Sequence, residues 1–386
     1  MKKSIYLDYA ATTPIDPRVL KAMMPYLEKK YGNTASMHQC GRIVNDALTE
    51  SRKIVSRSIM AKFSETYFTA SATESNNTVI KGVAWANQDK GKHIIISSIE
   101  HDCILNSAKW LEKQGWEITQ LKVDQKGLID LDQLKKSIRP DTVLVSIIYA
   151  SNEVGTIQNI TEIGKICRKK NVYFHTDASQ SYGKIAIDVN KSNIDLLTAS
   201  SHKIYGPKGA ALLYVRHGVK IEPLFHGGGH ENGFRSSTVN VSAIVGFAQA
   251  IKIYQQKRKV EAKRLTALRD KLTKGILENI KGSQLNGHPT QRLSNNVNIS
   301  FDKVEGESIL MMLDMEGIAV STGSACASAS LEPSHVLLAM GISVELAHSS
   351  IRFSLGRWTT EKEIERVILV LPKIIKKLRK ISPFKN

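Results

Sequence analysis

Short apolar runs alternate with amphipathic stretches over the first 215 residues of the chain. The apolar runs have the length of strands and lie at 66–70, 93–99, 117–123, 142–150, 172–176, 194–199 and 210–215. Most of the stretches between them place an apolar residue at every third or fourth position, which is typical of helices packed on one face. This alternation predicts a mainly parallel, seven-stranded sheet with helices on both faces, which is an α/β fold.

Helices are also predicted before and after the sheet. Asp16 and Pro17 indicate a helix start, because Asp can cap the first turn and Pro fits within it. A second helix is predicted at 42–60, and residues 241–278 predict one long helix rich in Lys and Arg. We interpret the long helix as a connector. We therefore expect a large domain at 15–260 and a smaller α+β domain formed by 1–14 and 261–386.

Composition places the chain among globular proteins. Its 386 residues suit two domains, and 42% hydrophobic and 23% charged residues are typical of a soluble protein. No apolar run reaches the length of a membrane span, and no apolar run follows the two N-terminal lysines as it would in a secretory signal. The four cysteines form no C-x-x-C pair, which predicts free thiols in a reducing, cytoplasmic location.

The chain is strongly basic, with 54 Lys and Arg against 36 Asp and Glu and a formal net charge of +18. A nucleic-acid partner is the first hypothesis for such a charge. The lysines are spread along predicted helices, however, and no basic motif interleaved with aromatic residues is present. Nucleic-acid binding is therefore disfavoured, and a basic face for an acidic protein partner fits at least as well.

The stretch 171–210 carries a carboxylate and a lysine at the ends of two predicted strands, Asp177 and Lys203. This is the pair that pyridoxal phosphate (PLP) requires. The lysine carries the cofactor as a Schiff base, and the carboxylate keeps the pyridine nitrogen protonated so that the ring accepts electrons. Asp and Lys are also common at solvated strand ends, so the pair alone leaves an ordinary surface role open.

Polar side chains follow three further strands, and all five would meet at one edge of a parallel sheet. Thr73 opens a helix and could hold a phosphate with the helix amides, and Ser200 and His202 could add contacts to it. Asn152 and Gln180 are neutral donors suited to a ring oxygen. His101 could stack on the pyridine and move protons, with a structural histidine as the alternative.

Two residues of the second domain add candidate chemistry. Cys326 lies in STGSACASAS, where small neighbours suit an exposed, travelling nucleophile better than a buried thiol. We interpret the other three cysteines, Cys40, Cys103 and Cys167, as structural. Arg352 could bind a substrate carboxylate through a bidentate pair. His226 and His230 are separated by three glycines, which argues against a helix-borne metal site.

Together these segments resemble the cysteine desulfurases of the NifS/IscS type, class V aminotransferases within the fold-type I PLP enzymes. The resemblance covers nearly the whole chain. It is carried by YLDYAATTP at the N-terminus, ATESNN at 72–77, EHDCIL at 100–105, SNEVGTIQ at 151–158, HTDASQSYGK at 175–184, SSHKIYGPKG at 200–209, GGGHENGFRSST at 227–238, STGSACAS at 321–328 and IRFSLGR at 351–357.

The resemblance implies a PLP-dependent homodimer that converts L-cysteine to L-alanine. It implies that Lys203 binds PLP covalently, that His101 stacks on the ring as acid and base, and that Cys326 carries the sulfur as a persulfide. Arg352 and Asn152 would bind the substrate. The implied cofactor contacts are Ala72, Thr73, His101, Asn152, Asp177, Gln180, Ser200, His202, Lys203 and, from the partner subunit, Thr238.

The implied sulfur acceptors are an iron–sulfur scaffold protein or a tRNA thiolation enzyme. No intrinsic metal site is expected, although the Cys326 persulfide can transiently ligate an iron–sulfur cluster. The chain departs from the family pattern at Ser71 and Ser237, where glycine is usual, and in its short segment after Ser382 and Pro383. The alternatives are a selenocysteine lyase, another class V PLP enzyme, or a non-catalytic assembly partner.

Overall fold

The computed structural model describes residues 4–322 and 332–381 of the chain. Its centre is a seven-stranded sheet of order β2-β8-β7-β6-β5-β3-β4. The strands are β2 (Thr66–Thr69), β3 (His93–Ser97), β4 (Glu117–Leu121), β5 (Thr142–Ser146), β6 (Tyr173–Asp177), β7 (Leu196–Ser200) and β8 (Ala211–Val215). Strand β8 alone runs opposite to the other six strands, so its pairings with β2 and β7 are antiparallel. The mainly parallel α/β sheet predicted from the apolar runs is therefore confirmed.

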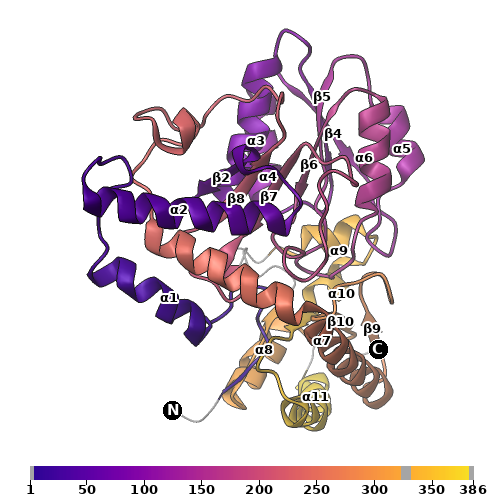
Figure 1. Ribbon diagram of the computed structural model, residues 1–386. Helices are drawn as coiled ribbons and strands as arrows, with labels where there is room; N and C mark the ends of the chain where they lie inside the picture. Colours follow the sequence, from indigo (N-terminus) through magenta and orange to yellow (C-terminus); the bar gives the residue numbers. More distant parts are fainter. Residues whose placement is uncertain (1–3, 323–331, 382–386) are drawn as a thin grey trace.

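Helices cover both faces of this sheet (Figure 1). Alternate strand residues separate the two faces: Ile95 and Val145 join one apolar cluster, and Ile94 and Leu144 join another. The first face packs against α1 (Pro17–Glu28), α2 (Gln39–Ser58), α6 (Ile160–Lys169) and the first part of α7 (Val241–Asn279). The second face packs against α3 (Ala72–Asn87) and α4 (Asp102–Glu112), and α5 (Leu131–Ser137) lies beside β4 and α6.

A second, four-stranded antiparallel sheet of order β12-β13-β10-β9 has its own apolar cluster. Its strands are β9 (Ser283–Leu285), β10 (Asn296–Phe301), β12 (Ser321–Thr322) and β13 (Ser350–Ser354). The cluster joins them to α8 (Gly306–Met315), to α11 (Glu361–Ile381) and to the second half of α7. The 39-residue α7 thus contributes to both cores, as a connector would.

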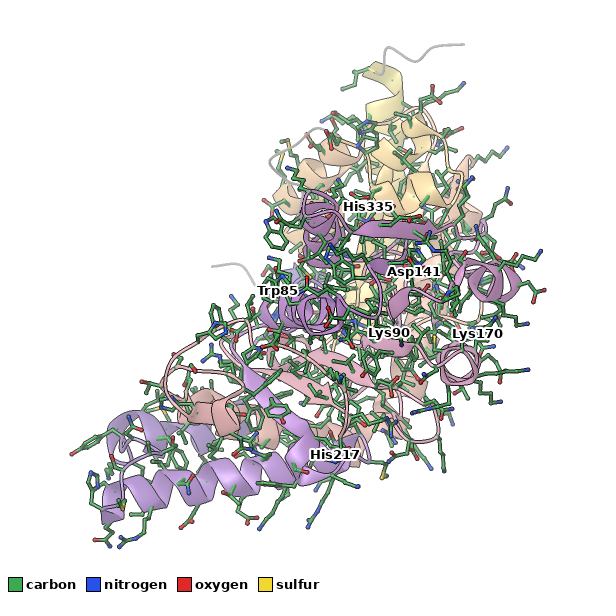
Figure 2. The ribbon with its side chains drawn as sticks, turned by 90° about the horizontal axis from the view of Figure 1, so that it is seen from above. Trp85, Lys90, Asp141, Lys170, His217 and His335 are labelled. Atoms are coloured by element: carbon green, nitrogen blue, oxygen red, sulfur yellow. The ribbon has the colours of Figure 1, made fainter. Side chains whose placement is uncertain are left out.

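The N-terminal segment also belongs to this second core. Strand β1 (Ile5–Tyr6) pairs in parallel with β11 (Ile318–Ala319), and the neighbouring Leu7 is fully buried in the second cluster. Two short helices, α9 (His335–Ala339) and α10 (Val344–His348), complete this part of the chain. In the view from above, the yellow C-terminal segment and the indigo N-terminal helices lie at opposite ends of the molecule (Figure 2).

The parallel strands bring the predicted polar residues to one edge. Because β2, β3, β5, β6 and β7 all point the same way, the segments that follow them leave the sheet on the same side. Every residue of β5, β6 and β7 except Tyr173 is buried, so these strands form a firm base for the segments at their ends. None of the helices in the described ranges combines the length and apolar character that a bilayer crossing requires.

Candidate active site

Lys203 ends a single 3-10 turn, Ser201–Lys203, directly after β7. Its ammonium Nζ donates to the carbonyl oxygens of Ala10 and Ala11 at 2.6 and 2.7 Å. Gln180, which follows β6, donates to the same Ala10 carbonyl at 2.9 Å. The N-terminal segment therefore brings two predicted site residues, Lys203 and Gln180, to one point.

Lys184 is a second amine near this point, which sequence reasoning missed. Its Nζ donates to the side-chain oxygen of Gln180 at 3.3 Å. Burial, and then the charge of Lys203, lowers the pKa of Lys184 to about 7. Its position four residues after Gln180 in SQSYGK was the available signal, because Gln180 and Lys184 both lie in the segment that follows Asp177 at the end of β6.

Asp177 is the last residue of β6, and it is buried at the edge of the sheet. Its two carboxylate oxygens accept hydrogen bonds from Asn76 Nδ2 at 2.7 Å and from the backbone N–H of Ser179 at 2.8 Å. His175, two residues earlier on β6, is fully buried, and burial lowers its pKa to about 4. His175 is therefore neutral at neutral pH and does not compensate the charge of Asp177.

His101 caps the N-terminus of α4, where its ring Nδ1 accepts from the backbone N–H of Cys103 at 3.2 Å. The thiol of Cys103 lies 3.2 Å from the same Nδ1. Asn76 Nδ2 also donates to this thiol at 3.2 Å. Cys103, interpreted from sequence as structural, thus contacts the site, and together with Asn76 it links His101 to Asp177.

The N-terminus of α3 lies beyond the end of β2 and is a potential anion site. Ser71 caps this helix through its hydroxyl, which accepts from the N–H of Glu74 at 3.1 Å. Ala72 and Thr73 occupy the first turn, where amide N–H groups have no intrahelical acceptor. A phosphate can therefore bind here by the amides and the helix dipole, as the sequence predicted for Thr73.

The two remaining phosphate candidates lie at the end of β7. Ser200 is the buried last residue of that strand. The ring Nδ1 of His202 lies 3.0 Å from Thr12 Oγ1. Burial, followed by the charges of Lys203 and Lys208, lowers the pKa of His202 to about 4. A neutral His202 can therefore offer a hydrogen bond but no positive charge.

Arg352 lies on β13 and is almost completely buried. Its guanidinium donates to Asp8 Oδ1 at 2.9 Å and to the backbone carbonyl of Asn152 at 3.2 Å. The buried Nε has no hydrogen-bond partner within the described part of the chain. A carboxylate that reached Nε would satisfy this donor, which makes Arg352 suitable for binding an amino-acid carboxylate.

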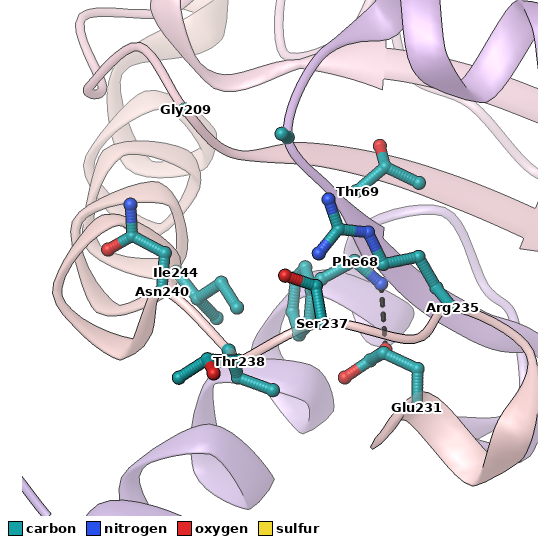
Figure 3. Close-up of a pocket in the computed structure, with 11 residues that line it drawn as sticks. Phe68, Thr69, Gly209, Glu231, Arg235, Ser237, Thr238, Asn240 and Ile244 are labelled. Carbon is teal, nitrogen blue, oxygen red and sulfur yellow. Dashed lines mark hydrogen bonds between the residues drawn. The ribbon is translucent and has the colours of Figure 1, made fainter. Parts of the chain in front are cut away.

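Thr238 lies away from these contacts, beside a cavity of about 210 Å³ that Thr69 and Gly209 also line. Figure 3 shows Ser237, Arg235 and Glu231 around the same cavity. Two ion pairs attach this segment to helices beside the sheet: Arg235 to Glu74 of α3 at 2.7 Å and the buried Glu231 to Arg52 of α2 at 2.6 Å.

Cys326 lies outside the described residues. The segments on either side of it are placed beside other site residues. Ser321 pairs in register with Arg352. Ser334 donates its hydroxyl to the buried carboxylate of Glu153, next to Asn152. In the described ranges, no group of three or more His, Cys, Asp or Glu side chains could hold a metal ion.

Comparison with known proteins identifies the chain's relatives. The family model for "Aminotransferase class-V" matches residues 5–367. "Cysteine desulfurase IscS" of Dictyoglomus turgidum is 51% identical over 386 residues, which is 100% of this chain and 98% of the relative. The protein of the same name from Methanosarcina thermophila is 50% identical over 381 residues, covering 99% and 94% of the two chains.

Solved structures agree with these relatives. A structure titled "NifS-like protein" matches with a TM-score of 0.92 and 37% identity over 97% of this chain and 100% of its own. A structure titled "SspA in complex with cysteine" matches with a TM-score of 0.82 and 35% identity over 92% and 100%. The chain therefore belongs to the aminotransferase class-V family and, within it, to the group of NifS- and IscS-type proteins.

Proposed function

We propose that this protein is a PLP-dependent cysteine desulfurase. It converts L-cysteine to L-alanine and transfers the sulfur to the thiol of Cys326 as a persulfide. One arrangement carries the proposal: Lys203 and the buried Asp177 lie at the ends of two strands on one sheet edge, and the buried Arg352 contacts Asn152 at the same edge. The Nε of Arg352 has no hydrogen-bond partner among the described residues. The relatives named cysteine desulfurase, at about 50% identity over the full chain, support the same activity.

The side chains at the sheet edge suit PLP. The α3 amides at Ala72 and Thr73, with Ser200 and His202, offer donors for a phosphate. Asp177, held by two N–H donors, offers a carboxylate to a pyridinium nitrogen. Asn152 and Gln180 offer neutral donors for the ring substituents. When bound, PLP supplies an electron sink that makes the bonds around the substrate's α-carbon labile.

Each remaining step is assigned to a residue of this chain. Lys203 would hold the cofactor covalently and would also serve to move protons. His101 exchanges protons at its ring Nε2. Arg352 binds the cysteine carboxylate and so fixes which bond faces the catalytic groups. The carbon–sulfur bond of cysteine breaks, a sulfur–sulfur bond forms on Cys326, and alanine leaves.

The proposal extends to the assembly. The enzyme acts as a homodimer, in which Thr238 reaches the phosphate in the partner subunit. An iron–sulfur scaffold or another protein then accepts the sulfur. The two apolar cores support a large domain at 15–260 and a small one formed by 1–14 and 261–386. A cytoplasmic location is supported by the free thiols Cys40, Cys103 and Cys167.

The first experiment incubates the purified protein with L-cysteine and measures alanine and sulfide. Lys203→Ala should abolish both products and should lose the lysine-linked PLP that borohydride traps. Lys191→Ala is the control, because its side chain is 86% exposed and pairs only loosely with Asp188 at 3.8 Å. Trapped PLP on a lysine other than Lys203 would refute the assignment.

A second experiment tests the sulfur carrier. Cys326→Ser should still bind PLP and L-cysteine, because those steps use Lys203, Asp177 and Arg352. It should neither store sulfur nor pass it on. Mass spectrometry after a cysteine pulse locates the persulfide, and finding it mainly on Cys40, Cys103 or Cys167 would overturn the proposal.

A further inference from the structure

A cysteine and a histidine in contact at a catalytic edge raise the question of which of them holds the proton. Cys103 Sγ lies 3.2 Å from His101 Nδ1. In a nucleophilic pair, the imidazole takes the thiol proton and the sulfur becomes a thiolate. In the opposite arrangement, the thiol keeps its proton and donates it in a hydrogen bond to the ring. The neighbouring groups decide between the two arrangements.

The backbone settles the state of the ring nitrogen. The N–H of Cys103 donates to His101 Nδ1 at 3.2 Å, and a backbone amide can only donate. A proton on Nδ1 would point at that N–H, so neither an imidazolium nor an Nδ1–H ring fits this contact. The neutral ring therefore carries its proton on Nε2.

Asn76 settles the state of the thiol. Its amide nitrogen donates to Asp177 Oδ2 at 2.7 Å and to Cys103 Sγ at 3.2 Å, using both of its protons. A flipped amide would place oxygen against the carboxylate of Asp177, where two acceptors repel each other. The sulfur therefore accepts from Asn76, and its own proton remains available for His101 Nδ1.

We infer that Cys103 is a positioning residue, which with Asn76 completes a hydrogen-bond chain between Asp177 and His101 and holds His101 as the neutral Nε2–H tautomer. Asn76 donates to both Asp177 and Cys103, and Cys103 donates to His101. The role of Cys103 in the reaction rests on the proposed function. His101 then begins as a proton donor through Nε2, and Nδ1 takes no part in the exchange. Cys103 stays a protonated thiol and does not act as a sulfur carrier.

The tautomer can be read directly by nitrogen NMR on holoenzyme labelled with 15N-histidine at neutral pH. The chain has 11 histidines, so the loss of one signal pair in His101→Gln assigns the ring. The wild-type ring should show a protonated Nε2 and an unprotonated Nδ1. A proton on Nδ1, or on both nitrogens, would overturn the inference.

Substitution of Cys103 separates hydrogen bonding from packing. Cys103→Ala removes the thiol donor but keeps the backbone N–H, so the share of the Nδ1–H tautomer should rise and turnover should fall by about fivefold, the effect of one hydrogen bond. Cys103→Ser keeps a donor, and it should retain the wild-type tautomer and at least half of the turnover.

Cys40→Ala is the matched control, because Cys40 is an exposed thiol on α2. Cys40→Ala should change neither the tautomer of His101 nor turnover. If Cys103→Ala matched the wild type in both the tautomer and turnover, the thiol would be mere packing and the inference would fail. Because the tautomer is read without substrate, a wild-type protein that releases no alanine from L-cysteine would refute the proposed function and not this inference.

Discussion

At the scale of single residues, the site depends on charged groups whose burial is compensated by specific donors. Asp177 is a buried carboxylate with an N–H donor on each oxygen, from Asn76 and Ser179. These two donors hold the carboxylate in place, where a pyridinium nitrogen could bind it. A buried carboxylate without them would be costly.

Asp177→Asn tests this role. The substituted amide keeps the size of the side chain but carries no charge, so the electron sink should weaken and turnover should fall by about 100-fold or more. The measurement compares alanine release at equal PLP loading. Near-normal turnover of PLP-loaded Asp177→Asn would contradict the role of the carboxylate.

Glu100 is a buried acid that sequence reasoning did not single out. One of its oxygens accepts from Ser97 Oγ at 2.6 Å and from the N–H of Ile148 at 2.7 Å, and the other has no partner among the described residues. Burial raises the pKa of Glu100 to about 8. The fold therefore favours the neutral acid, and the unfolded chain, with its ordinary pKa of about 4.3, favours the carboxylate.

The sign of the pH dependence follows from this difference. Between about pH 4.3 and pH 8 the folded state holds one more proton than the unfolded state, so stability falls as pH rises through this window. Glu100→Gln should remove that contribution, which is on the order of 5 kcal/mol in total. Urea unfolding at a series of pH values measures it, with Glu112→Gln on the exposed face of α4 as the control. Parallel curves for wild type and Glu100→Gln would contradict a neutral Glu100.

At the scale of elements, the candidate site is formed by the segments that follow the parallel strands more than by the strands themselves. Helix α3 presents its first turn at the sheet edge because β2 ends at Thr69 and Ser71 caps the helix two residues later. Helix α4 begins in the same way after β3, with the His101 ring as its cap. Two helices thus begin just beyond the ends of parallel strands, and such N-termini favour an anionic ligand.

The cap of α3 can be tested by itself. Ser71→Ala should lower the free energy of unfolding by about 1 kcal/mol, because the N–H of Glu74 loses its acceptor. Ser71→Gly should cost only a few tenths of a kcal/mol. Denaturant titration of both variants makes the comparison. Equal losses in the two variants would mean that the hydroxyl is not the stabilising group.

At the scale of the whole molecule, net charge and shape govern encounters with partners. The chain carries a net charge of +18, and part of it gathers on α11. Lys373, Lys376, Lys377 and Lys380 are exposed there, whereas Arg379 is half-buried and paired with Asp302. The lysines of this helix therefore form the basic surface that can attract an acidic protein.

We predict that binding of the sulfur acceptor weakens several-fold between low and high ionic strength. Replacing Lys373, Lys376, Lys377 and Lys380 by alanine should weaken binding at low salt and flatten the salt dependence. Lys29→Ala with Lys30→Ala, two exposed lysines directly after the end of α1, serves as the control. A binding constant that does not vary with salt would remove α11 as an electrostatic docking surface.

The local sequence determined the elements. Five-residue apolar runs specify buried strands, and Asp16 with Pro17 specifies the start of α1, because these signals depend only on near neighbours. The predicted ends of the helices were less accurate than their presence. Helix α2 begins at Gln39, three residues before the predicted start, because His38 caps it through its ring nitrogen. The polar residues after each strand could also be found, since parallel strands must deliver their ends to one edge.

Only the tertiary structure decided which side chains meet at the ends of the parallel strands. Asn76 lies on α3, 101 positions from Asp177, and Asp8 lies 344 positions from Arg352. No periodicity or spacing encodes such pairs, because they depend on how sheet, helices and N-terminal segment pack together. The same holds for Lys184 and Glu100, whose pKa values are shifted by burial, and for Cys103, whose thiol contacts Asn76 on another helix. Sequence alone therefore determined the fold and the candidate chemistry, and packing decided which partner holds each proton and charge.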